Sequence, residues 1–162
     1  MMFKIEQIKS GGQTGADMGG LLAAEDLGLK TGGFIPKGFI TERGPRPDLA
    51  RFGLQETASR DYPPRTRLNI QYSDGTVIFT RFPMGRGSRL TFTTAVKMGK
   101  PHLIVDPLKV DASLEFRTWL DLHLIRVLNV AGSRESKWPG IEETVRQFIR
   151  LSLTGRVTPN RK

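Results

Sequence analysis

Short apolar runs alternate with longer helix-like runs along this chain, and that alternation limits the folds open to it. Runs typical of strands predict strands at 3–8, 33–35, 77–80, 102–105 and 127–130. Runs typical of helices predict helices at 16–27, 90–98, 112–122 and 141–151. Strands that alternate with helices form parallel sheets with helices on both faces. The sequence therefore predicts an α/β three-layer sandwich with a mostly parallel sheet of about five or more strands.

The 162 residues fit one domain. We expect residues 1–152 to form a single ligand-binding domain and the basic residues 153–162 to form a mobile tail. Residues 36–75 carry prolines and arginines without clean periodicity, so we interpret them as a long binding-loop region with one short helix.

The composition excludes several kinds of chemistry. The chain has no cysteine, which excludes a disulfide framework, a thiolate nucleophile and a cysteine-based metal centre. The two histidines lie far apart in the sequence, so no protein-ligated metal is expected. No apolar stretch approaches the roughly 20 residues of a membrane span, and the N-terminus lacks a signal-peptide pattern. We expect a cytoplasmic protein without a membrane partner.

A net charge of +9 and a pI near 10.4 predict a surface that attracts anions. Nucleotides, phosphorylated cofactors and nucleic acid are all candidates. The arginines between 43 and 67 are interleaved with acidic residues, so a solvated basic surface without a specific ligand is an equal alternative.

The stretch SGGQTGAD, residues 10–17, stands between the first predicted strand and the first predicted helix. Glycines in this position let backbone N–H groups converge on an anion at a helix N-terminus. The stretch is neither a Walker loop nor a G-x-G-x-x-G fingerprint. A tight turn with Asp17 as a first-turn acid is the alternative interpretation.

Two further glycine-containing stretches follow predicted strands: GRGSRLT at 85–91 and NVAGSRESKWPGIE at 129–142. Loops at the carboxyl ends of parallel strands face one edge of the sheet, where open α/β folds bind ligands. Candidate hydroxyl and cationic contacts are Ser10, Thr14, Ser88, Thr91, Ser133, Ser136, Lys37, Arg86, Arg89 and Arg134. For any one of these side chains, an ordinary solvent-exposed position on the surface is an equally good interpretation.

Two other stretches carry candidate residues. GGFIPKG places Lys37 after a predicted strand, and RTRLNIQYSDGT places Asn69, Asp74 and Thr76 around the start of a buried one. Asp74 followed by Gly75 is equally typical of a simple turn.

These motifs, in this order, resemble a known family. SGGQTGAD, GGFIPKG with TERG, RTRLN with SDGT, GRGSRLT with GKP, and NVAGSRESKWPGI are similar to the proteins provisionally named molybdenum carriers. That family is a circularly permuted branch of the Rossmann-like SLOG superfamily. The resemblance covers roughly residues 8–149, and the permutation is visible because the GSR-type loop lies near the C-terminus rather than at the start.

The resemblance implies a carrier for the molybdenum cofactor (molybdopterin) or a related nucleotide-like phosphorylated ligand. It also implies a homo-oligomer and a molybdoenzyme as a possible acceptor of the cofactor. No cysteine is needed, since the pterin dithiolene holds the metal itself. By position, the implied ligand contacts are Gly11, Gly12, Thr14, Gly15 and Asp17 in the first loop, Gly87, Ser88 and Thr91 in the second, and Gly132, Ser133 and Arg134 in the third.

The sequence also departs from its relatives. Arg43 stands where the family commonly has an acid, and SLOG hydrolases carry a catalytic Glu where this chain has Thr91. A phosphoribohydrolase would need Asp17, Glu42 or Asp74 as a substitute acid. A sensor of an ADP-ribose-type nucleotide signal is a further alternative. Single-stranded DNA binding ranks last, because few aromatic side chains are available for stacking.

Overall fold

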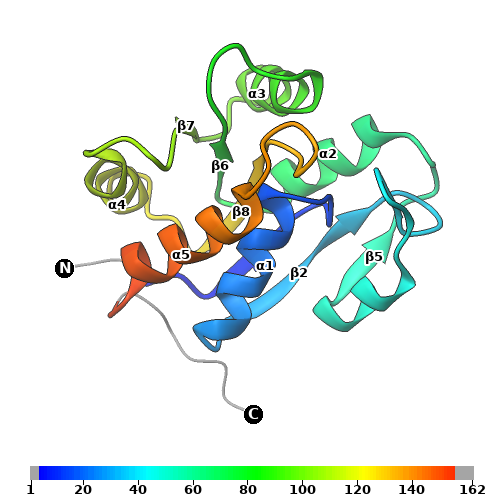
Figure 1. Ribbon diagram of the computed structural model, residues 1–162, viewed down its shortest axis with the longest axis horizontal. Coiled ribbons are helices and arrows are strands. Elements are labelled where there is room, and N and C mark those ends of the chain that lie inside the picture. The colour runs from blue at the N-terminus through cyan, green and yellow to red at the C-terminus, as the bar shows by residue number, and fades with distance from the viewer. Residues whose placement is uncertain (1–3, 156–162) are drawn as a thin grey trace.

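A computed structural model describes residues 4–155 of the chain. In this part of the chain, six parallel strands form one sheet in the order β5-β2-β1-β8-β6-β7 (Figure 1). The strands are β1 (Gln7–Lys9), β2 (Lys30–Ile35), β5 (Leu54–Glu56), β6 (Gly75–Phe79), β7 (His102–Val105) and β8 (Val127–Gly132). The chain is therefore an α/β Rossmann-like protein, as the alternation predicts.

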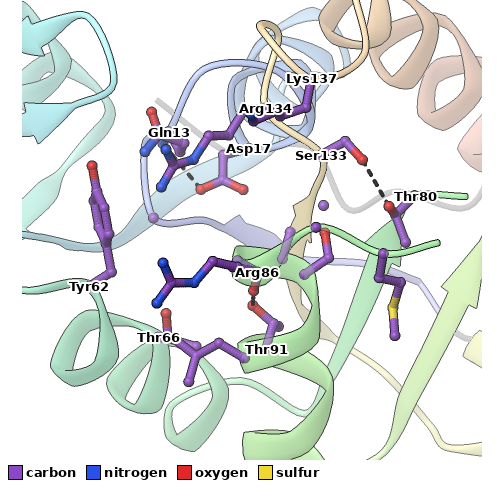
Figure 2. A pocket seen from close by; sticks show the side chains of 18 of the residues that line it. Gln13, Asp17, Tyr62, Thr66, Thr80, Arg86, Thr91, Ser133, Arg134 and Lys137 are labelled. Carbon is purple, nitrogen blue, oxygen red and sulfur yellow. Dashed lines mark hydrogen bonds between the residues drawn. The ribbon is translucent and has the colours of Figure 1, made fainter. Parts of the chain in front are cut away.

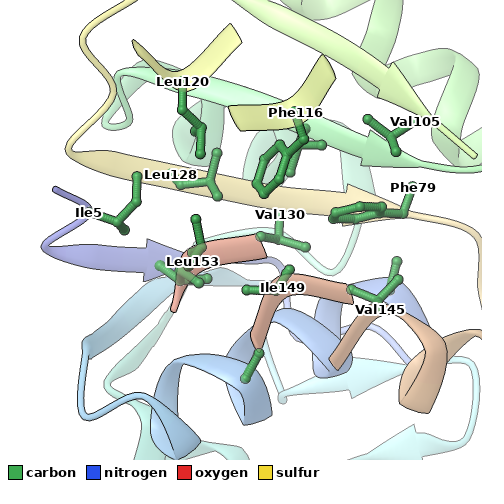
Figure 3. Packing of buried hydrophobic residues seen from close by; sticks show 14 of the residues in the cluster. Ile5, Phe79, Val105, Phe116, Leu120, Leu128, Val130, Val145, Ile149 and Leu153 are labelled. Carbon is green, nitrogen blue, oxygen red and sulfur yellow. The ribbon is translucent and has the colours of Figure 1, made fainter. Parts of the chain in front are cut away.

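Helices cover both faces of the sheet. The helices α1 (Ala16–Asp26), α4 (Ala112–Leu122) and α5 (Ile141–Leu153) lie on one face, and α2 (Tyr62–Gln71) and α3 (Arg86–Met98) lie on the other (Figure 1). Figure 3 shows Phe116 of α4 and Ile149 of α5 packed against Val130 and Phe79 of the central strands. All five residues of β6 are buried, as expected for a strand covered on both faces.

Two glycines let α1 approach its neighbours closely. A Cβ at Gly20 would lie 2.7 Å from the Cβ of Val130 in β8, and a Cβ at Gly19 would lie 2.4 Å from the carbonyl oxygen of Glu142 in α5. Such distances are too short for any larger residue. The close packing brings the start of α1 next to the loop that follows β8.

The segment 36–75 is more regular than the sequence predicts. It contains the hairpin β3 (Ile40–Thr41) and β4 (Gly44–Pro45), the short 3-10 helix η1 (Pro47–Phe52), strand β5 and helix α2. A second apolar cluster of α1, β2, η1 and β5 holds this segment, with Leu21, Ile35, Leu49 and Leu54 at its centre. The expectation of a long loop is thus wrong, because nonlocal burial orders short elements that have no clear periodicity.

Several element boundaries differ from the expected ones, and the short helix of segment 36–75 now has defined bounds. Helix α3 begins at Arg86 rather than residue 90, so Gly87 and Ser88 belong to its first turn. Helix α2 begins at Tyr62 and tolerates Pro63 and Pro64, because the first turn has no intrahelical partner for their missing N–H groups. Helix α5 continues to Leu153, and residues 156–162 of the expected tail lie outside the described residues.

Within residues 4–155, none of the helices has the length and apolarity that crossing a bilayer requires.

Candidate functional site

A cavity of about 950 Å³ lies at the carboxyl ends of β1, β8 and β6. Because β8 lies between the other two strands, the loops that follow all three meet at this edge of the sheet. The cavity is lined by residues of the first loop, the start of α3 and the loop after β8: Gly11, Gln13 and Asp17, then Gly85 to Ser88 with Leu90 and Thr91, then Gly132 to Arg134 with Lys137 and Trp138. Its volume is at the upper end of the range for small-molecule sites.

The lining of the cavity is strongly cationic. One acidic side chain, Asp17, faces five basic ones: Arg65, Arg81, Arg86, Arg134 and Lys137. Figure 2 shows Asp17 and Arg134 on one wall and Arg86 reaching in from the start of α3 on the other. Such an excess of positive charge in a concave site favours an anionic ligand.

The first loop and the loop after β8 are in direct backbone contact. The N–H of Ala16 donates to the carbonyl oxygen of Ser133 at 3.0 Å. Gly15 makes this approach possible, because its φ is +83° and a Cβ there would lie 2.3 Å from that same oxygen. The hydroxyl of Ser133 is in turn 2.8 Å from that of Thr80 at the end of β6 (Figure 2). All three strand ends are therefore linked.

Asp17 and Arg65 form a buried pair at the cavity wall. Their side chains are 9% and 10% exposed, with Arg65 Nη1 3.9 Å from Asp17 Oδ2. Arg65 donates to the carbonyl oxygen of Gly11 at 2.7 Å, and the N–H of Gln13 donates to Asp17 at 3.1 Å. Burial raises the pKa of Asp17 to about 6, although Arg65 and the backbone N–H groups of Gln13 and Gly11 oppose the rise.

Glu42 ties the β3–β4 hairpin to two of the loops. Its carboxylate accepts hydrogen bonds from the Thr14 hydroxyl and from the backbone and hydroxyl of Ser136. Burial alone would raise the pKa of Glu42, but these hydrogen bonds from Ser136 and Thr14 outweigh it and hold the pKa below its ordinary value. Glu42 itself does not line the cavity, so its role here is to hold the loops together.

Two aromatic rings line the cavity, and arginines lie over both. Arg65 and Arg134 lie 4.9 and 5.1 Å from the centroid of the Tyr62 ring, and Arg81 lies 4.3 Å from that of Trp138. These cation–π contacts hold the guanidinium groups at the cavity edge without neutralising their charge.

Helix α3 points its N-terminus at the cavity. No side chain caps it, and a Cβ at Gly85 or Gly87 would meet nothing within 4 Å, so the backbone there is open to a ligand. The hydroxyl of Thr91 donates within the helix to the carbonyl oxygen of Gly87 at 3.1 Å. The first-turn N–H groups of such a helix favour negative charge.

The structure brings many of the predicted site residues together at the cavity: Gly11, Asp17, Asn69, Gly87, Ser88, Thr91, Gly132, Ser133 and Arg134. The predicted residues that do not line it are Ser10, Gly12, Thr14, Gly15, Lys37, Asp74 and Thr76. Asn69 exchanges two hydrogen bonds with the backbone of Phe34, and thereby joins α2 to β2.

The residues outside the lining have identifiable structural contacts. Ser10 accepts a hydrogen bond from the N–H of Gly12, and a Cβ at Gly12 would face Leu54 and Ile35 rather than a ligand. Asp74 accepts the N–H groups of Arg126 and Val127, where β8 begins.

Thr76 accepts a hydrogen bond from the amide of Asn129 in the neighbouring strand. Lys37 is exposed on the loop after β2.

Several lining residues were missing from the predicted set: Gln13, Tyr62, Arg65, Thr80, Arg81, Lys137 and Trp138. The spacing of Arg65, Thr66 and Asn69 is that of one helix face, and a helix at 62–71 would have revealed it. Gln13 lies inside a motif already selected for its glycines, hydroxyl and acid. Trp138 lies inside the third glycine-containing stretch but was not selected, and Tyr62 carried no local signal of a site.

These features define a Rossmann-like α/β protein with a cationic cavity at the carboxyl edge of its sheet. The comparison with family models is more specific: residues 8–153 match the model of the circularly permutated YpsA SLOG family. The chain therefore belongs to that family, and the resemblance found in the sequence motifs is confirmed.

A solved structure agrees with this assignment. A crystal structure from Syntrophus aciditrophicus SB, of a protein provisionally named a molybdenum carrier, is 36% identical to this chain, with a TM-score of 0.89 over 94% of this chain and 98% of that one. An FMN-dependent UbiX-like decarboxylase from Escherichia coli O157:H7 also aligns over 96% of both chains. Its identity of 16% and TM-score of 0.35 are too low to indicate a related fold. No curated protein matches the sequence.

Proposed function

We propose that this protein binds and carries a phosphorylated small molecule, with the molybdenum cofactor as the first candidate. The observation that supports this proposal is the cavity itself, in which Asp17 is outnumbered by five cations beside an open helix N-terminus. The name of the relative from Syntrophus aciditrophicus points to a molybdenum-containing ligand. A pterin phosphate supplies the anionic group that such a cavity favours.

The residues present fit this cofactor as a cargo. Its dithiolene holds the metal, so the protein needs to contact the pterin and the phosphate only. In the described residues, no three His, Asp or Glu side chains gather as a protein-ligated metal would require. The volume of about 950 Å³ also exceeds what a lone oxyanion would fill, which favours an organic ligand.

The phosphate would lie at the α3 N-terminus and Arg86, and Arg134 would contact the ligand from the opposite wall. The glycines at positions 85 and 87 leave the backbone N–H groups accessible there. A homo-oligomeric state and a molybdoenzyme as acceptor remain part of the proposal, since a carrier must hand its cargo on.

The test is to load the protein anaerobically with molybdenum cofactor freshly released from a molybdoenzyme. Gel filtration, followed by oxidation of the pterin to its fluorescent product, measures what co-elutes with the protein. We expect co-elution with the wild type and a large loss with Arg134→Ala. Arg46→Ala is the matched control, because Arg46 pairs with Asp48 at 2.8 Å outside the cavity lining. Fluorescence that elutes only with small molecules would contradict the proposal.

Native mass spectrometry of protein purified without added ligand gives a second readout. It reports the mass of any bound phosphorylated molecule and the oligomeric state together. A bound nucleotide in place of a pterin would move the proposal to the nucleotide-type ligands.

A further inference from the structure

Gln13 carries a polar group that the protein itself leaves unused. The residue is 5% exposed, lines the cavity, and its amide nitrogen has no hydrogen-bond partner among the described residues. A buried donor without a partner destabilises the folded protein, so it calls for an explanation. Neither the fold nor the loop contacts described above supply one.

The orientation of this amide is fixed. Its oxygen accepts hydrogen bonds from the N–H of Thr14 at 3.0 Å and from the N–H of Glu42 at 2.8 Å. Both partners are donors, so the oxygen must face them and the nitrogen must face away. The Gln13 amide nitrogen is therefore a donor of fixed orientation, in a residue that lines the cavity.

An acceptor lies next to this donor. The backbone N–H of Gln13 binds the carboxylate of Asp17, and Figure 2 shows the two residues side by side near Arg134. A carboxylate has about four acceptor positions, and the N–H groups of Gln13 and Gly11 occupy at most two of them. Asp17 is also the sole acid in the lining, where phosphate oxygens would be repelled by it.

The ligand edge that complements this wall has a carbonyl oxygen beside N–H donors. We propose that Gln13 and Asp17 together bind the 2-amino lactam edge of a heterocycle, with the Gln13 amide donating to the ring carbonyl and Asp17 accepting from the ring N–H and the amino group. Guanine and pterin share this edge. The inference rests on the proposed function and deepens it, because it assigns the ring of the ligand to the wall opposite the α3 N-terminus.

The experiment compares four probes by isothermal titration: GMP, neopterin monophosphate, AMP and ribose 5-phosphate. The first two carry the edge, AMP carries a ring without it, and ribose 5-phosphate has no ring. We expect GMP and neopterin monophosphate to bind at least about tenfold tighter than AMP and ribose 5-phosphate, since two or more buried hydrogen bonds distinguish them. The tighter of the two then names the source of the ring.

The variant Gln13→Glu isolates the donor. A glutamate side chain keeps an oxygen that can accept from the N–H groups of Thr14 and Glu42, and it replaces the unpartnered amide nitrogen with a second oxygen. We expect the preference for GMP over ribose 5-phosphate to fall about tenfold or more, and this ratio cancels the general effect of the added charge on phosphate. Gln7→Glu, which adds the same charge in β1 outside the cavity lining, should leave the ratio unchanged.

The outcomes separate the two proposals. AMP that binds as tightly as GMP and neopterin monophosphate, or a ratio unchanged in Gln13→Glu, would overturn the ring assignment and leave phosphate binding intact. Failure of all four probes to bind the wild type would overturn the proposed function and this inference with it.

Discussion

Arg65 and Asp17 belong to different helices, yet their buried side chains approach to 3.9 Å at the wall of the cavity. Arg65 comes from α2 and Asp17 from the first turn of α1, and both also bind the glycine loop between β1 and α1. The pair fixes the loop's shape, and it places an acid of raised pKa inside a cationic site.

The raised pKa of Asp17 predicts a pH-dependent stability. Because its pKa is about 6 when folded and 3.8 ordinarily, the native state binds the proton more tightly than the unfolded chain. This contribution is complete below pH 4 and is lost as pH rises to about 6, with a maximum of about 3 kcal/mol. Urea unfolding from pH 4 to 7 should show wild type losing stability relative to Asp17→Asn. A difference that is flat or rises with pH would contradict this.

Gly15 should be far less tolerant of a side chain than Gly28. Both have positive φ, but a Cβ at Gly15 would lie 2.3 Å from the carbonyl oxygen of Ser133, whereas one at Gly28 meets nothing within 4 Å. We expect Gly28→Ala to cost about 1 kcal/mol of unfolding free energy and Gly15→Ala at least about 2 kcal/mol. Equal costs in chemical denaturation would show that the two loops can separate.

Arg134→Ala should weaken the binding of GMP by about 1.5 to 3 kcal/mol, the range for a lost charge-assisted hydrogen bond. Arg134 lines the cavity with its guanidinium over the Tyr62 ring, so its charge lies where a ligand would bind. Arg46→Ala, remote from the cavity, should change the affinity little. Isothermal titration measures both, and equal effects would argue against a single ligand bound in the cavity.

Salt dependence distinguishes a small ligand from nucleic acid. A single-stranded oligonucleotide neutralises many cations, and its affinity falls with a log–log slope of about 0.7 per phosphate. A ligand with one phosphate should show a shallow slope. Titrations of GMP and of a thymine oligonucleotide at several salt concentrations make the comparison. A steep slope with no dominant arginine would favour the nucleic-acid alternative.

Hydrolysis of nucleoside monophosphates should be undetectable. By the family resemblance, Thr91 stands at the position of the hydrolase Glu, and its hydroxyl is bonded within α3. Glu42 is bound by Thr14 and Ser136 outside the lining. Chromatography of AMP and GMP after prolonged incubation would reveal released base. Release at enzymatic rates that disappears in Asp17→Asn would instead identify Asp17 as the acid of a hydrolase.

The sequence by itself determined the class of fold, and it indicated the edge of the sheet at which the cavity lies. Apolar periodicity reports local burial, so it identified β6, α1 and the alternation that requires a parallel sheet. Glycines at strand ends marked the loops that meet at one edge. The motifs also identified the family, since the stretches SGGQTGAD and NVAGSRES are specific to it.

Only the tertiary structure decided which side chains share the cavity. Arg65 reaches Gly11 across 54 residues, and Glu42 reaches Ser136 across 94, and no local pattern encodes either contact. The same holds for Gly12, which faces an apolar cluster although its motif suggested a ligand. Apolar periodicity describes one helix or strand at a time. These contacts depend instead on the order of the strands and on nonlocal packing, because those decide where each side chain points.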